Sequence, residues 1–332
     1  MLVPEKYPFC SILIANFNGK HHLTDCLTSL MKLKYPKDKI EIIIIDNGST
    51  DSSVEFVKNN FPKATILQLN KNYGFAESNN KGIKIAKGDF IIILDNDTKV
   101  DEKWLIELVK VALSDKKIGI CGSKVLDFNN PQIIQYSGGY LDILGSPYHR
   151  GLGELDKKKY DKIEEVFYAF GCSMLIKKEI LSQLEYFFDP SYFAYFEETD
   201  LCWRIKYLGY KVVYVPTSIV LHKSGATSKK MGDLMILYLY RNKIWTFKKN
   251  LRMPLKQIIL LFVSVRVVFA ILYRILTKKW KYGIYVFKFL FTNKKSDVDL
   301  KKISLKKQLA TLSLPILSKY SQYFFIEKIR IE

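Results

Sequence analysis

The 332-residue sequence has no Cys-x-x-Cys pair, although it contains five cysteines: Cys10, Cys26, Cys121, Cys172 and Cys202. Structural zinc sites and disulfide frameworks need cysteines at suitable spacings, so this scatter indicates reduced thiols in a cytosolic setting. Residues 1–9 also lack the apolar core of a signal peptide, which predicts that the N-terminus stays in the cytoplasm. Disorder is excluded because 48% of the residues are hydrophobic and 14% are aromatic.

Two nucleotide-binding fingerprints are missing as well. No Gly-x-Gly-x-x-Gly follows the first apolar run, and no Gly-Lys-Ser/Thr loop occurs anywhere. Dinucleotide dehydrogenases and P-loop enzymes are therefore disfavoured, because both use such loops to bring backbone N–H groups against phosphates. If this chain binds a diphosphate, another group must neutralise it, and a divalent metal held by carboxylates is suited to that.

Acidic residues are scarce only in the last third of the chain. Residues 1–228 contain 29 Lys+Arg and 28 Asp+Glu, a net charge of +1, whereas residues 229–332 contain 23 and 5, a net charge of +18. This shift predicts two regions, a domain at 1–228 and a basic, mostly helical region at 229–332. The apolar run at 255–276 carries Arg266 at its centre, so a bilayer span, an interfacial helix and a helical subdomain packed on the core remain alternatives.

The surroundings of that run favour a membrane surface as its partner. Lysines, Trp and Tyr flank it on both sides, and such residues suit an anionic lipid headgroup layer. No RNA- or DNA-binding motif occurs, so no nucleic acid is expected. The resulting expectation is a protein at the cytoplasmic face of the cell membrane, held peripherally or interfacially by its C-terminal region.

The first hundred residues alternate apolar runs with helix-like stretches, the pattern of an α/β protein. Strands are predicted at 9–17, 40–47, 64–70 and 89–97, and helices lie between them, the last at 74–88 and closed by Gly88. Continuous aliphatic runs fit strands that are covered by helices on both faces. Further strands are predicted around 165–181 and 210–222, with a helix ending at Gly209 between them. Residues 126–164 lack periodicity and are predicted to be a long glycine-rich loop that covers a binding site.

Polar residues gather where these strands end. Asp46 and Asn47 follow the second strand, and Asp95, Asn96 and Asp97 follow the fourth. In open α/β sheets ligands bind beyond the carboxyl ends of the strands, so both groups are candidates for a site. Taken alone, Asp-Asn-Asp is equally well explained as a turn, because all three side chains bond nearby backbone.

Seven motifs in a fixed order favour a binding site over a simple turn, because they resemble those of a known family. They are SILIANFNG, IIIIDNGSTD, NYGFAESNNKGI, FIIILDNDT, GCSMLIKKEIL, FAYFEETDLCWRIKYLGY and VLHKSGATS. In this order, over residues 9–228, they resemble the family 2 glycosyltransferases, and most closely the rhamnosyltransferase-like branch. The resemblance implies a GT-A fold, an open mixed and mainly parallel sheet between helices. It also implies inverting transfer of a sugar from a nucleotide-diphosphate donor, such as dTDP-rhamnose or a UDP-sugar.

The resemblance also implies roles for individual residues. Mg²⁺ or Mn²⁺ would be held by Asp97, His222 and Asp95. The donor would be bound by Asn18, Asp46, Asn72, Asn79 and Asp95. The general base would be Glu198, where the family usually has Asp, with Glu197 and Asp200 as alternates. Two interpretations remain for Gly171, Cys172 and Ser173, a tight turn or the floor of the acceptor pocket, and the floor is the one predicted here. Asp200 is equally well explained by the helix N-terminus that it occupies.

The predicted function is therefore a metal-dependent glycosyltransferase that acts on a glycan or polyprenyl-lipid-linked acceptor in surface polysaccharide biosynthesis. Two alternatives come from other classes: a nucleotidyltransferase, which also uses a carboxylate-held metal, and a non-catalytic lipid-binding protein on a degenerate transferase scaffold. No recognisable pattern in the sequence identifies the donor sugar and its base or the acceptor. The same holds for the choice between Mg²⁺ and Mn²⁺ and for the oligomeric state.

Overall fold

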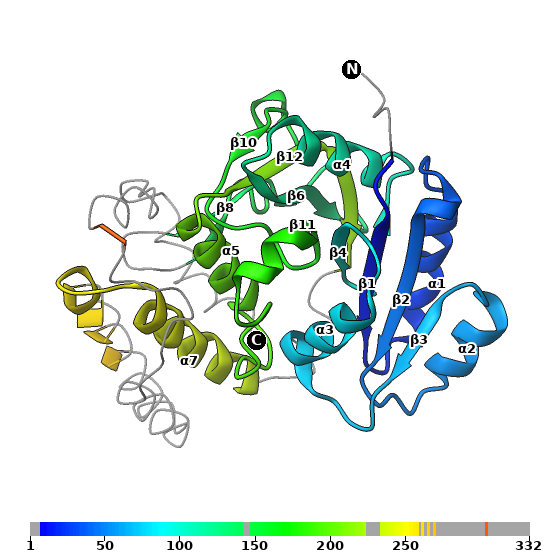
Figure 1. Ribbon diagram of the computed structural model, residues 1–332, viewed down its shortest axis with the longest axis horizontal. Coiled ribbons are helices and arrows are strands. Elements are labelled where there is room, and N and C mark those ends of the chain that lie inside the picture. The colour runs from blue at the N-terminus through cyan, green and yellow to red at the C-terminus, as the bar shows by residue number, and fades with distance from the viewer. Residues whose placement is uncertain are drawn as a thin grey trace.

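A computed structural model describes residues 7–141, 147–223 and 233–258, together with residues 260–261, 264–265, 268–269 and 303–304 (Figure 1). The predicted alternation of strands and helices is confirmed in its first half. The elements there are β1 (Cys10–Asn16), α1 (Lys20–Met31), β2 (Ile40–Asp46), α2 (Ser53–Asn60), β3 (Thr65–Gln68), α3 (Gly74–Ile85) and β4 (Phe90–Leu94). Strand β1 pairs in parallel with both β2 and β4, and β2 pairs in parallel with β3.

The second half of the chain completes a mixed sheet. Its elements are β5 (Thr98–Val100), α4 (Trp104–Ser114), β6 (Ile118–Asp127), β7 (Ile134–Tyr136), β8 (Gly139–Leu141), β9 (Pro147–His149), β10 (Glu164–Glu165), β11 (Ser173–Lys177), α5 (Glu197–Tyr207), β12 (Lys211–His222) and α7 (Asp233–Asn250). The main sheet runs β10-β12-β6-β11-β4-β1-β2-β3, with β5 on β12 and β7 on β6. Strand β11 is antiparallel to both β4 and β6.

Alternate side chains of the central strands enter two different cores. In β1, Ile12 and Ile14 pack with α1 and α4, whereas Leu13 between them packs with α3 and α5. Strand β4 divides in the same way, with Ile92 on the first face and Ile93 on the second. Burial on both faces is the reason these strands read as unbroken aliphatic runs. The sheet is thus a middle layer between helices, as expected.

Three predicted details were wrong. Helix α3 ends at Ile85 rather than Gly88, because Ala86 is already extended. Glu197 and Glu198 lie in the first turn of α5 rather than ahead of it. Residues 126–164 are not one irregular loop, because β7 pairs with β6 and β8 pairs with β9. These strands of three residues are too short to show a periodic pattern in the sequence.

Helix α7 belongs to the same core as α5. Its Ile244 and Phe247 are fully buried in the cluster that contains Trp203 and Ile205 of α5, and the two helices lie together in Figure 1. The boundary predicted between residues 228 and 229 therefore does not coincide with the edge of this core. Within the ranges described above, no helix has the length and apolarity required to cross a bilayer. Most of the run at 255–276 lies outside the described residues.

Candidate active site

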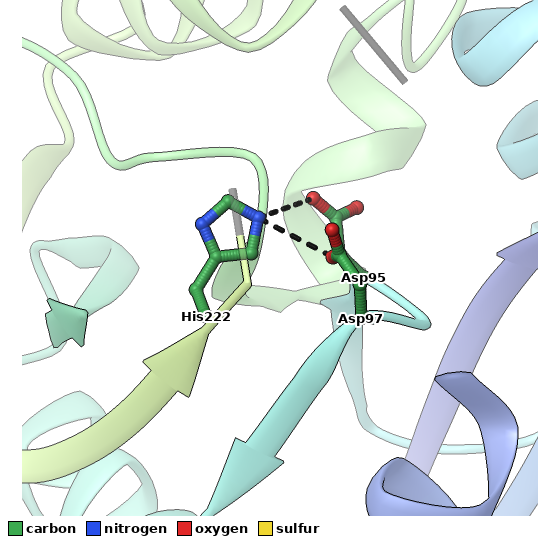
Figure 2. Close-up of side chains that lie close together, drawn as sticks. All are labelled: Asp95, Asp97 and His222. Carbon is green, nitrogen blue, oxygen red and sulfur yellow. Dashed lines mark ion pairs between the residues drawn. The ribbon is translucent and has the colours of Figure 1, made fainter. Parts of the chain in front are cut away.

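Two carboxylates and an imidazole meet at the carboxyl-terminal edge of the sheet (Figure 2). The Nε2 atom of His222 lies 3.3 Å from Oδ1 of Asp97 and 3.9 Å from Oδ2 of Asp95. Ligand atoms of all three residues lie within 4.8 Å of one another. Two ligands on one ion at about 2.1 Å are about 3–4 Å apart, and oxygen with imidazole suits Mg²⁺ or Mn²⁺. The three side chains therefore fit a divalent cation.

Backbone pairing brings these distant residues together. Strand β5 begins directly after Asp97 and runs antiparallel to β12, so that Thr98 is paired with His222. The N–H of Lys223 also donates to the carbonyl oxygen of Asp97 at 3.0 Å. Asp95 is fixed separately, because its N–H donates to the carbonyl oxygen of Cys172 at 3.0 Å. Each candidate ligand is thus held by backbone hydrogen bonds and not only by side-chain packing.

Gln135 orients the imidazole, a role that could not be predicted from the sequence. Its Oε1 lies 2.8 Å from Nδ1 of His222, and its Nε2 donates to the His222 carbonyl oxygen at 2.9 Å and to Oδ2 of Asp127 at 3.1 Å. With Nδ1–H donating to this acceptor, Nε2 is left facing the carboxylates. Metal-bound histidines are commonly held by such a second hydrogen bond. Gln135 lies on β7, whose three residues left no recognisable pattern.

Asp95, Asp97 and His222 shift one another's pKa values. Burial, and then the neighbouring Asp97, raise the pKa of Asp95 to about 7, against a lowering effect of His222. Burial acts to raise the pKa of Asp97 as well, but the hydrogen bond and charge of His222 outweigh it and hold that pKa below its usual value. Burial acts to lower the pKa of His222, yet Asp97 and Asp95 raise it overall. The cluster favours positive charge at its centre, whether a proton or a cation.

Glu197 and Glu198, a second pair of carboxylates, are the first two residues of helix α5. Burial, followed by the adjacent Glu198 and by Asp95, raises the pKa of Glu197 well above its usual value, and among the described residues its Oε2 has no hydrogen-bond partner. Burial raises the pKa of Glu198 to about 7, with Asp95 contributing in the same direction. A carboxyl group with a pKa near 7 is well matched to accept a proton at neutral pH.

Gly171 and Cys172 lie between the two groups of carboxylates. A Cβ atom placed on Gly171 would be 3.8 Å from the Cβ of Glu198, while Cys172 bonds to Asp95 through its carbonyl oxygen. Ser173 is placed differently. Its hydroxyl is buried and bonded to Trp104 and Ser123 inside the sheet, where it links α4 to β6 and β11. Of the three residues predicted to floor the acceptor pocket, two adjoin Glu198 and Asp95 and the third supports the core.

Asp200, which was predicted as an alternate general base, takes part in a buried network of ion pairs and hydrogen bonds. Its Oδ2 accepts from Nε of Arg204 at 2.9 Å and from Nζ of Lys249 at 3.0 Å, and its Oδ1 accepts from Asn250 at 2.8 Å. Burial acts to raise its pKa, but Lys249 and Arg204 hold it below the usual value. Both carboxylate oxygens are therefore occupied, and the geometry does not support Asp200 as an alternate general base.

The predicted donor-binding residues lie at the ends of β1 and β2 and at the start of α3. Asn16, which the sequence analysis missed, connects them: its Nδ2 donates to Asp46 at 3.4 Å and its Oδ1 accepts from Asn96 at 2.7 Å. Asn18 has a positive φ of 50°, and its Oδ1 accepts from the N–H of Thr50 at 2.7 Å. Asp46 is thus tied to the loop that carries Asp95 and Asp97.

Of the other two donor candidates, Asn79 lies on α3 and Asn72 lies two residues before its first residue. Asn72 accepts a hydrogen bond from the N–H of Gly74 at 2.8 Å and so supports the start of this helix. Asn79 is fully buried; its Nδ2 donates to the carbonyl oxygen of Phe75 at 2.9 Å, and no residue in the described part of the chain bonds to its Oδ1. Both residues therefore hold the helix that borders the site, and neither side chain is bonded to the carboxylate clusters.

The fold is that of the GT-A glycosyltransferases, and comparison with known proteins identifies the family. Residues 11–184 match the profile of glycosyl transferase family 2, and the chain belongs to this family. It is 28% identical over 214 residues to the poly-beta-1,6-N-acetyl-D-glucosamine synthase of Staphylococcus aureus (strain COL), covering 63% of this chain and 48% of that protein. The chain thus spans about half the length of this curated relative.

Solved structures show the same fold at lower identity. The mannosyltransferase PcManGT from Pyrobaculum calidifontis, in complex with GDP-Man and Mn²⁺, is 16% identical with a TM-score of 0.56, over 87% of this chain and 88% of that one. Staphylococcus aureus TarS 1-349 in complex with UDP is 16% identical with a TM-score of 0.54, over 77% and 70%. The predicted family and the GT-A fold are therefore confirmed.

Proposed function

We propose that this protein is an inverting glycosyltransferase that moves a sugar from a nucleotide-diphosphate donor to a glycan or lipid-linked acceptor during polysaccharide synthesis. The observation that carries the proposal is the convergence of Asp95, Asp97 and His222 on one point, with Glu198 nearby and tuned to a pKa of about 7. The relatives support it, since one is a polysaccharide synthase and others were solved with UDP or with GDP-Man and Mn²⁺.

In the proposed reaction, different residues would bind the cation, contact the donor and accept the proton. Asp95, Asp97 and His222 would hold Mg²⁺ or Mn²⁺, which when bound supplies positive charge opposite the donor diphosphate. Asp46, on its loop beside Asn18, would contact the nucleoside. Glu198 would accept the proton of the acceptor hydroxyl as the hydroxyl oxygen bonds to the anomeric carbon. The bond between that carbon and the diphosphate oxygen breaks on the opposite side, and the electron pair leaves with the nucleoside diphosphate.

Product analysis distinguishes this function from its rivals. The full-length protein is incubated with Mn²⁺ and a panel of UDP-, dTDP- and GDP-sugars, with and without oligosaccharide acceptors. Release of a nucleoside diphosphate that disappears in Asp97→Asn supports a transferase. Release or consumption of pyrophosphate instead would indicate a nucleotidyltransferase. No turnover with any donor, and Mn²⁺ binding unchanged in Asp97→Asn, would contradict the proposal.

A peripheral position at the cytoplasmic membrane face is part of the same proposal. It is supported by the net charge of +18 over residues 229–332 and by the interspersed aromatic residues. Flotation of the full-length protein with vesicles tests it. Binding to vesicles containing anionic lipid, weakened by salt and absent with neutral vesicles, is expected. Equal partitioning with both kinds of vesicle would argue against it.

A further inference from the structure

The backbone directly before the two glutamates is unusual. Tyr195 and Phe196 both have a φ of 72°, in the left-handed region that residues with a Cβ seldom occupy. Helix α5 begins with the next residue, Glu197, and the carbonyl oxygen of Phe196 accepts the N–H of Asp200 at 2.8 Å. The direction in which Glu197 and Glu198 leave the backbone is therefore set by this turn. Such a conformation persists only where the surrounding structure holds it.

One buried side chain of α7 holds the turn. Nδ2 of Asn242 donates to the carbonyl oxygens of Ala194 and Tyr195, both at 2.8 Å, and Asn242 is fully buried. The orientation of its amide is fixed in turn, because Nε of Arg241 donates to Oδ1 of Asn242 at 2.8 Å. Both amide hydrogens are therefore used on successive carbonyl groups of the turn.

The same segment is fixed on its other side by α3. The N–H of Phe75 donates to the carbonyl oxygen of Phe193 at 2.7 Å. Gly74 has a φ of 79°, and a Cβ there would lie only 2.3 Å from that oxygen. The turn at 193–196 is thus hydrogen-bonded on one side to α3 and on the other to α7, which belongs to the basic C-terminal part of the chain.

We infer that Asn242 is a positioning residue for Glu198: its two hydrogen bonds hold the left-handed turn that aims this carboxylate at the acceptor hydroxyl. The inference rests on the proposed function and extends it, because it makes the beginning of the C-terminal region part of the catalytic geometry. Asn242 touches neither carboxylate and acts only through the backbone of residues 194–196.

Two substitutions and a matched control test the inference. Asn242→Ala removes both donors, and Asn242→Asp keeps the shape but places an oxygen against two carbonyl oxygens. Thr246→Val is the control: Thr246 is also fully buried on α7, one turn further along, and its hydroxyl bonds to Tyr192 at 2.8 Å rather than to the turn. A general loss of α7 packing would affect all three variants alike.

The expected result is a fall in kcat of about 10- to 100-fold in both Asn242 variants, since small displacements of a reacting group cost this much. The KM for the donor and the affinity for Mn²⁺ should stay within about twofold of the wild type, because the donor and metal residues lie elsewhere. Amide hydrogen exchange over residues 194–200 should accelerate in these variants and not in Thr246→Val.

Two outcomes would overturn the inference. One is a kcat within twofold of the wild type in Asn242→Ala or Asn242→Asp. The other is an equal loss of kcat and equal exchange in Thr246→Val, which would indicate packing alone. If the wild type turned over no nucleotide sugar, the proposed function would fail instead, and the exchange comparison would still test whether Asn242 holds the turn.

Discussion

Gln135 offers a direct test of the candidate metal site. It is 7% exposed, and it is the acceptor for Nδ1 of His222 at 2.8 Å. Replacing it with Leu removes this acceptor and leaves the buried Nδ1–H without a partner, so the imidazole is free to turn its Nε2 away from Asp97. Losing such a supporting residue typically weakens metal binding about 10- to 100-fold. That factor corresponds to about 1.4–2.7 kcal/mol.

The measurement is a Mn²⁺ titration followed by electron paramagnetic resonance of the free ion. Gln135→Glu retains an oxygen that accepts the Nδ1–H but loses the Nε2 donor to Asp127 and to the His222 carbonyl oxygen, so its affinity should lie between those of the wild type and Gln135→Leu. His222→Ala should lose more affinity than Gln135→Leu. Equal Mn²⁺ affinity in wild type and Gln135→Leu, with a clear loss in His222→Ala, would refute the orienting role. Unchanged affinity in both variants would refute the triad itself.

Three further predictions follow from the described contacts. Transfer by the wild type should rise with pH through about 7 and then level off, because Glu198 works deprotonated and burial raises its pKa to that value; a flat profile, or full activity in Glu198→Gln, would exclude it as the base. Lys249→Met should lower the free energy of unfolding in urea by about 3–5 kcal/mol, since it leaves the buried Asp189 and Asp200 without their shared cation. Lys206→Met is the control, with an expected cost of about 0–1 kcal/mol because its partner Glu165 is half-exposed; equal costs would contradict the burial argument. A chain ending at residue 228 should fail to unfold cooperatively by calorimetry, because it lacks α7; a cooperative transition at the full-length Tm would disprove that.

The central strands and the first carboxylate cluster could be predicted because their signals are local. Ile12 to Ile14 and Ile91 to Ile93 are continuous apolar runs, and only strands covered on both sides need such runs. Asp95 and Asp97 stand directly at the end of one of them, where the topology of the sheet places ligands. Their meeting with His222 was foreseeable from motif order, although the pairing of β5 with β12 that produces it was not.

The supporting residues could not be predicted because their roles depend on tertiary contacts. Gln135, Asn16 and Asn242 are ordinary amides in the sequence, and only the fold shows what each one bonds to. Lys249 illustrates the limit of composition: it counts toward the basic charge of the last third, yet it is 1% exposed and pairs with two buried aspartates. The charge count favoured a membrane surface as the partner of residues 229–332, whereas α7 in this region packs into the core.

Strand β12 contains a bulge ahead of His222. Between Val215 and Ile219 the pairing with β6 shifts, so that the intervening residues, beginning with Pro216, are extra on the β12 side. Beyond the bulge the pairing resumes, with His222 opposite Asp127 of β6 and Thr98 of β5. Because side chains in a strand alternate between faces, this register decides to which face the imidazole points. An intact Asp-x-Asp pair is therefore not sufficient for the cation site, because a change of register in β12 would turn His222 away while every proposed ligand stays in the sequence.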